Sequence, residues 1–180
     1  MLQLNMYFVI HTTSGKEDEL IKNIKKNYDS SIFNDVFSAK RELRKKFNGK
    51  WNDITERLFP GYIFVETDSP KEMHLLLNSI EGYSKVVGFK DNEIIHYLPL
   101  SELEEEFIKG LAGKEDDHVI SISEIEVLEG KNIRVISGPL LGLEGIVKKV
   151  NLHKRIAEVE TIFLNQPVMI EFGIEIIKRV

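Results

Sequence analysis

The first 110 residues alternate between strand-like and helix-like hydrophobic patterns. Two β-rich apolar runs, "MYFVIHTT" (6–13) and "GYIFVET" (61–67), predict strands, and "YSKVVGF" (83–89) and "NEIIHYLP" (92–99) predict shorter ones. Between them, apolar side chains recur at helical spacing; the first such set is Leu20, Ile21, Ile24 and Tyr28. This alternation predicts an α/β sandwich, with flanking helices packed on a mainly antiparallel sheet.

Each predicted helix begins with the spacing of a capping box, in which a Ser hydroxyl and a Glu carboxylate bond to each other's backbone N–H groups. The pairs are Ser14 with Glu17, Ser69 with Glu72, and Ser101 with Glu104. Pro70 suits the first position of the second helix. Before that helix, Asn48-Gly49 stands between polar strand-like flanks and predicts a tight β-hairpin.

The pattern changes after residue 112. "AGKEDDH" (112–118) has a glycine, then charges and no periodicity, so we expect a linker at 113–124 between domains of residues 1–112 and 125–180. Five short strand-like runs follow: "NIRVI", "EGIVKKV", "RIAEVETI", "QPVMIEF" and "EIIKRV". Their close spacing predicts a small five-stranded barrel, and the fold class is therefore α+β with two domains.

The charge pattern separates one acidic segment from two basic islands. The net charge is −5, and residues 91–129 carry 12 acidic and 2 basic side chains. The basic islands are "KRELRKKFNGK" (40–50) and "KKVNLHKR" (148–155). A phosphate backbone would be attracted to these islands, although each also fits a solvated edge or turn.

Several classes of site are excluded by composition. The chain has no cysteine, which rules out disulfides and thiolate metal sites and is typical of the reducing cytoplasm. It shows no basic leader and no apolar run of roughly 20 residues, so we expect neither a signal peptide nor a membrane partner. The carboxylate runs at 104–106 and 115–117 are typical of solvated faces, and the five histidines have no ligand spacing. We expect no catalytic residue, no metal and no cofactor.

A glycine-rich turn interrupts the C-terminal strands. Gly138-Pro139 suits a tight turn, and Gly142 and Gly145 allow the backbone to bend before "IVKKV". The segment "NIRVISGPLLGLEGIVKKVN" resembles the KOW motif. Independently, "MYFVIHTTSGKEDEL" and "LFPGYIFVE" resemble the first strand and helix and the Phe-Pro-Gly-Tyr strand of the NusG N-terminal (NGN) domain.

The chain as a whole is therefore similar to the NusG family of transcription elongation factors, with NGN and KOW domains. The resemblance implies an SH3-like barrel for the KOW domain. Leu140, Leu143-Glu144 and the His-Lys-Arg run look more like the LoaP-type specialised antitermination paralogs than like housekeeping NusG. These departures put Rho binding in doubt more than polymerase binding.

The resemblance implies a non-enzymatic factor, acting in the cytoplasm as a monomer, that binds the clamp helices of RNA polymerase and suppresses pausing and termination. The residues matched to the apolar polymerase pocket are Tyr7, Phe59, Pro60, Gly61 and Tyr62. Exposed aromatic anchors often dominate binding energy, but the rings also fit an ordinary core.

The two basic islands are the candidate nucleic-acid contacts. Residues expected to face DNA, such as the non-template strand, or RNA are Lys40, Arg41, Arg44, Lys45 and Lys46. Residues expected to contact a nascent RNA hairpin, as in LoaP-like proteins, are Lys148, Lys149, His153, Lys154 and Arg155.

Two other functions stay open. Housekeeping relatives dock a small-subunit ribosomal protein or Rho on the KOW barrel, and the matching positions here are Ile162 and Phe163. A ribosome-associated KOW protein that binds RNA is the third possibility. Because strand patterns run throughout 130–180, we expect the barrel to keep its fold.

Overall fold

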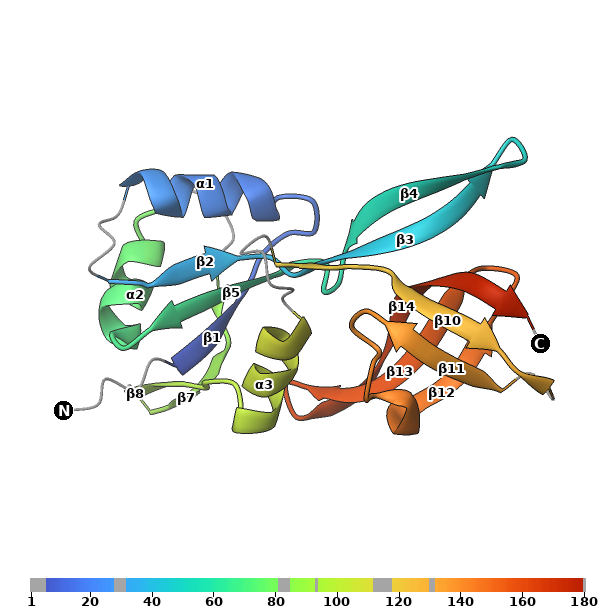
Figure 1. Ribbon diagram of the computed structural model, residues 1–180. Helices are drawn as coiled ribbons and strands as arrows, with labels where there is room; N and C mark the ends of the chain where they lie inside the picture. The colour runs from blue at the N-terminus through green and yellow to red at the C-terminus, as the bar shows by residue number, and fades with distance from the viewer. Residues whose placement is uncertain are drawn as a thin grey trace. The chain divides into compact units, whose positions relative to one another are not determined.

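The apolar runs of the N-terminal half form one antiparallel sheet in the computed structural model, which describes residues 6–27, 32–80, 85–92, 94–111, 118–129 and 132–179 (Figure 1). In sheet order its strands are β2 (Asp35–Phe37), β5 (Tyr62–Thr67), β1 (Met6–His11) and β6 (Lys85–Val86). The helices are α1 (Glu17–Asn27), α2 (Pro70–Leu77) and α3 (Glu102–Leu111). A separate hairpin joins β7 (Gly88–Asp91) to β8 (Ile94–Tyr97).

The two faces of this sheet carry different side chains. On one face, Phe8 and Ile10 of β1 belong to an apolar cluster with residues of α1 and α2, which cover this face in Figure 1. The cluster also holds Leu20, Ile24, Ile63, Val65, Met73 and Leu77. Tyr7 alternates with these residues and lies on the opposite face beside Phe37. The helical stripe is confirmed for Leu20 and Ile24, whereas Tyr28 lies outside the described residues.

One of the three predicted capping boxes is confirmed. The Ser101 N–H donates to the Glu104 carboxylate at 2.8 Å, and the Glu104 N–H donates to the Ser101 hydroxyl at 3.4 Å. The second box is wrong, because the Ser69 hydroxyl bonds the Asp68 carboxylate instead of capping α2. The first is also wrong, because Glu17 bonds two glycines, as described below.

The second half of the chain builds a five-stranded sheet. Its strands, in sheet order, are β11 (Ile133–Ser137), β10 (Ser123–Val127), β14 (Gln166–Arg179), β13 (Ile156–Phe163) and β12 (Val147–Asn151), with the short helix η2 (Glu144–Ile146) before β12. β10 and β14 pair in parallel, and the other ladders are antiparallel. A three-stranded sheet adds β4 (Lys50–Arg57), β3 (Lys40–Phe47) and β9 (Val119–Ile120).

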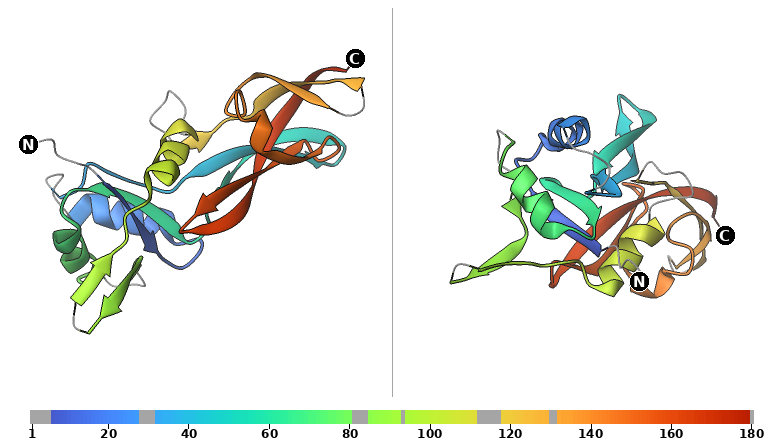
Figure 2. Two further views of the ribbon diagram at one scale, coloured as in Figure 1. Left: turned by 90° about the horizontal axis from the view of Figure 1, so that it is seen from below. Right: turned by 90° about the vertical axis from the view of Figure 1, so that its left-hand side faces the viewer.

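The structure corrects one detail of the predicted barrel and one of the predicted linker. The runs "QPVMIEF" and "EIIKRV" form one long strand, β14, drawn in orange-red in Figures 1 and 2. Gly173 lies inside this strand, where a Cβ atom would overlap the Glu42 carbonyl oxygen of β3. Part of the predicted linker is also strand, because β9 pairs with the start of β3 and Ser123 of β10 pairs with Ile174.

The chain divides into two compact units. The first unit is made by Met1–Ala39 with Phe59–Glu106, and the second by Lys40–Leu58 with Phe107–Val180. The predicted hairpin is confirmed, with Asn48 and Gly49 both at positive φ (48° and 81°). The hairpin falls in the second unit, whereas we predicted it in the N-terminal domain of residues 1–112.

Candidate functional site

The bend before β5 is fixed by backbone hydrogen bonds. The Thr12 N–H donates to the Gly61 carbonyl at 2.8 Å, and the Tyr62 N–H donates to the Phe59 carbonyl at 3.2 Å. Gly61 has φ of +83°, and a Cβ atom there would lie 3.1 Å from the Thr12 carbonyl oxygen. Both the left-handed conformation and the close approach therefore require glycine. The bend holds Pro60 at the surface, where its ring is exposed.

Glu17 anchors this bend from the inside. Its side chain is 0 % exposed, and its two carboxylate oxygens accept hydrogen bonds from the Gly61 N–H at 2.7 Å and the Gly15 N–H at 2.8 Å. Charge-assisted bonds of this kind compensate the burial of the carboxylate. Glu17 was assigned to a capping box because of its spacing from Ser14. That spacing does not distinguish a helix cap from a hydrogen bond to the distant Gly61.

The aromatic residues of the predicted polymerase pocket lie at different depths. Tyr7 and Phe59 are 8 % and 9 % exposed, and Phe59 makes an edge contact with Phe64 at a centroid distance of 6.0 Å. Both rings belong to the core, whereas we expected them to line a pocket at the surface. Tyr62 is half-buried and makes an edge contact with His11 at 5.1 Å. Within the predicted set, the rings presented at the surface are those of Pro60 and Tyr62.

Tyr7 has the most perturbed hydroxyl of this region. Burial, together with the negative charges of Glu66, Asp35 and Glu105, raises the pKa of Tyr7 from 10.0 to about 12. Its backbone is fixed as well, since the Tyr7 N–H donates to Glu105 at 3.2 Å and its carbonyl accepts from Leu100 at 2.8 Å. Tyr7 therefore stays neutral at physiological pH as a buried residue of the core.

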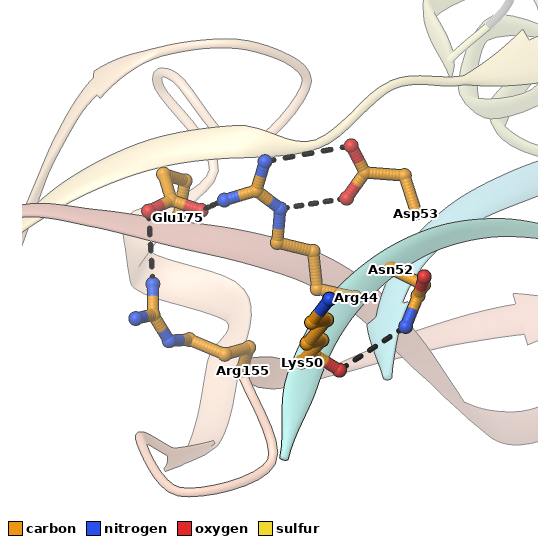
Figure 3. Close-up of polar contacts among 6 residues, drawn as sticks. All are labelled: Arg44, Lys50, Asn52, Asp53, Arg155 and Glu175. Atoms are coloured by element: carbon orange, nitrogen blue, oxygen red, sulfur yellow. Dashed lines mark hydrogen bonds and ion pairs between the residues drawn. The ribbon is translucent and has the colours of Figure 1, made fainter. Parts of the chain in front are cut away.

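The first basic island is largely paired with carboxylates inside the second unit. Arg41 donates to the Glu171 carbonyl of β14 at 2.8 Å, and Lys45 pairs with Glu56 of β4. Arg44 bonds Asp53 at 2.6 Å and also bonds Glu175 of β14 (Figure 3). The bond to Arg44 lowers the pKa of Asp53 below its ordinary value. Lys40 is half-buried and Lys46 is exposed.

The second basic island lies on β12 and on the turn to β13. Lys148 pairs with Glu160 at 2.9 Å, and Lys149 pairs with Glu158 at 3.4 Å. Exposed pairs of this kind contribute at most about 1 kcal/mol, so a phosphate can replace either carboxylate. His153 and Lys154 are exposed.

Arg155 brings the two islands together. It donates to Glu175 at 3.0 Å, so one carboxylate is shared by Arg155 and Arg44, as Figure 3 shows. Burial, together with the positive charges of Arg44 and Arg179, lowers the pKa of Arg155 below its ordinary value. Sequence reasoning missed Glu171 and Glu175, because no local pattern predicts a contact with a residue about 130 positions away.

The glycine-rich turn after β11 packs against β10. The Leu140 N–H donates to the buried Ser123 hydroxyl at 3.0 Å, and Leu140 itself is 0 % exposed. Gly138 and Gly142 have positive φ, as expected, whereas Gly145 lies in η2 and its φ needs no glycine. Of the residues matched to a partner site, Ile162 is exposed and Phe163 is buried.

Sites of other kinds are absent from the described residues. In this part of the chain, no three His, Asp or Glu side chains are grouped to hold a metal ion. Nor does any helix there have the length and apolar character needed to cross a bilayer. The acidic run at 115–117 lies outside the described residues.

Comparisons with known proteins match both halves of the chain. A family model described as "Transcription termination factor nusG" matches residues 5–107, and one described as "KOW motif" matches residues 129–162. "Transcription termination/antitermination protein NusG" of Thermus thermophilus is 25% identical over 186 residues, covering 93% of this chain and 95% of that protein. The protein of that name from Lactococcus lactis is 28% identical over 170 residues, covering 92% and 89%.

A solved structure supports the same fold. The structure titled "Domain interaction in Thermotoga maritima NusG" aligns with a TM-score of 0.51 and 22% sequence identity, covering 94% of this chain and 93% of that one. The likeness extends over both halves of the chain.

Proposed function

Because this chain belongs to the NusG family, we propose that it is a transcription elongation and antitermination factor that binds RNA polymerase through the Phe-Pro-Gly-Tyr bend. Members of the family are transcription factors that act with RNA polymerase, and the relatives named above carry termination and antitermination in their names. The clamp helices are the proposed contact, and the cytoplasm is the proposed compartment.

The observation that best supports polymerase binding is that hydrogen bonds fix the Phe-Pro-Gly-Tyr bend. Glu17 and the glycine backbone fix its shape before any partner arrives, which lowers the entropy lost on binding. Pro60 and Tyr62 are the surface contacts in this proposal, whereas Tyr7 and Phe59 are buried in the core of the same unit. A half-buried tyrosine on a rigid bend has the properties of an interface anchor.

The second unit is the proposed reader of the transcript. We infer that its five strands close as an SH3-like KOW barrel, and that cations of β12, its following turn and the hairpin contact nascent RNA. The LoaP-like features at Leu140 and in the His-Lys-Arg run favour a specialised antitermination role. The exposed side chain of Ile162 favours one alternative, in which a ribosomal protein or Rho docks on this sheet.

Binding of the full chain to RNA polymerase tests the proposal. We expect Tyr62→Ala to weaken binding at least about tenfold, as for an anchor residue. Phe89→Ala is the matched control, since Phe89 is 52% exposed in the same unit and lies outside the bend. Equal affinities for wild type and Tyr62→Ala, with folding verified by circular dichroism, would show that the bend is not the polymerase contact.

A further inference from the structure

The chain has a single tryptophan, Trp51, and it lies where the two basic islands meet. The Arg155 guanidinium lies over the Trp51 ring, 5.0 Å from its centroid. Glu175 in turn holds both Arg155 and Arg44 (Figure 3). The hairpin and the β12–β13 turn, about 100 residues apart in sequence, therefore form one surface within the second unit.

Trp51 is fixed without being covered. Arg155 occupies one side of the indole by a cation–π contact, yet 38% of Trp51 remains exposed. Large aromatic side chains are usually buried, because exposing them to water is unfavourable. A fixed and partly open aromatic ring beside cations is the arrangement on which proteins stack unpaired bases.

Two lysines beside Trp51 are available for phosphates. Lys46 is the cross-strand neighbour of Trp51, and Lys154 directly precedes Arg155 in the turn. Both side chains are exposed, and no carboxylate of a described residue lies within 4.0 Å of either ammonium group. They differ in this from Lys148 and Lys149, which are paired.

We propose that Trp51, Lys46 and Lys154 form a composite site for unpaired RNA, which deepens the proposed function and depends on it. The indole stacks on one base, and the two ammonium groups bind phosphates on either side. Arg155 and Glu175 are positioning residues that hold the indole in place. Duplex RNA does not expose the faces of its bases, so the site selects single strands.

Tryptophan fluorescence of the full chain tests the stacking directly, because Trp51 is the only tryptophan. We expect an unstructured RNA oligonucleotide to quench the emission as it binds. Trp51→Ala should weaken binding about tenfold, measured by anisotropy of labelled RNA, and Trp51→Phe should recover part of the loss. Binding without a change in emission, or unchanged affinity in Trp51→Ala, would overturn the site.

The hairpin provides its own control. Phe47 and Lys50 are cross-strand partners that alternate with Lys46 and Trp51, so they lie on the opposite face. Phe47→Ala should therefore leave RNA affinity within about twofold of wild type. Equal losses in Phe47→Ala and Trp51→Ala would overturn the assignment to the Arg155 side.

The salt dependence of RNA binding tests the two lysine contacts, and a comparison of single-stranded and duplex nucleic acids tests the preference for unpaired RNA. Lys46→Gln and Lys154→Gln should each lower the slope of log K against log salt by about 0.7, the value for one contact with a single strand. Duplex RNA of the same sequence should bind more weakly than the single strand, and single-stranded DNA no more tightly than RNA. Tighter binding of duplex or of DNA would overturn the assignment to unpaired RNA.

Measuring polymerase binding in the same variants distinguishes a failure of the RNA site from a failure of the proposed function. Trp51→Ala should bind polymerase as wild type does, because the bend belongs to the other unit. If wild type and Trp51→Ala bind polymerase equally and bind RNA equally, the RNA site alone is refuted. Failure of wild type to bind polymerase would instead refute the proposed function.

Discussion

The bend of the first unit is held by one fully buried carboxylate, whereas the hairpin of the second unit is held by carboxylates that remain partly in solvent. Glu17 bonds two backbone N–H groups with no exposure, while Glu175 bonds two arginines with a side chain that is 27% exposed. Buried charge-assisted bonds are strong and insensitive to salt, and exposed ion pairs are weak and screened. The first surface is therefore preformed, whereas the second depends on ion pairs that salt weakens.

The largest expected effect comes from removing the buried carboxylate. Glu17→Ala leaves the Gly61 N–H without its acceptor, and we expect a loss of about 3 kcal/mol in the free energy of unfolding by urea. Glu19→Ala is the control, since Glu19 is exposed on the same helix and pairs only with Lys16. A loss below about 1 kcal/mol for Glu17→Ala would mean that the bend is not held from the inside.

Gly173→Ala tests how closely the hairpin approaches β14. The added Cβ would overlap the Glu42 carbonyl oxygen, so the backbones must separate, at an expected loss of about 1–3 kcal/mol. Gly145→Ala is the control, because a Cβ there meets no atom within 4 Å. Equal stability of both variants in thermal unfolding would contradict the packing of β3 against β14.

Glu175→Gln weakens the ion pairs that join Glu175 of β14 to Arg44 of the hairpin and to Arg155. Because its partners are partly exposed, we expect a loss of less than about 1 kcal/mol at low salt, and a smaller loss at high salt. Glu160→Gln, which affects only the exposed pair with Lys148, should have no measurable effect. A loss of stability in Glu175→Gln that does not change with salt would mean that Glu175 acts as a buried carboxylate, as Glu17 does.

The smallest effect at neutral pH is that of the Tyr7 hydroxyl. Its pKa of about 12 lies above the ordinary 10.0, so its contribution to stability is complete below pH 10 and is lost as the pH rises toward 12. Tyr7→Phe should reduce this alkaline loss of stability and remove the tyrosinate absorbance that appears near its pKa of about 12. An unchanged alkaline profile in Tyr7→Phe would contradict the burial of this hydroxyl.

Features that depend on neighbours in sequence were predictable. Asn48-Gly49 gave the hairpin, because both residues tolerate positive φ, and Ser101 with Glu104 gave the cap of α3. The Phe-Pro-Gly-Tyr segment was correctly located before a strand. The alternation Ile120-Ser121-Ile122-Ser123 also predicts strand, but the preceding charges led to its assignment as linker.

Features that depend on distant contacts were not predictable from local patterns. The runs on either side of Gly173 were predicted as two strands, because sequence cannot distinguish a break at a glycine from a close approach of another backbone. The same limit applies to Glu17, whose partner Gly61 is 44 residues away. The segments of the candidate sites were predicted from sequence, but the burial of Tyr7 and Phe59 and the contact of Arg155 with Trp51 required the fold.

The most direct test of the central claim is the affinity of the full chain for RNA polymerase, measured for wild type and Tyr62→Ala at low and high salt. Since the bend is apolar and preformed, we predict tight wild-type binding that changes little with salt, and binding at least about tenfold weaker in Tyr62→Ala at both salt concentrations. Equal affinity of the two proteins, or wild-type binding that disappears at high salt, would contradict the assignment of polymerase binding to this bend.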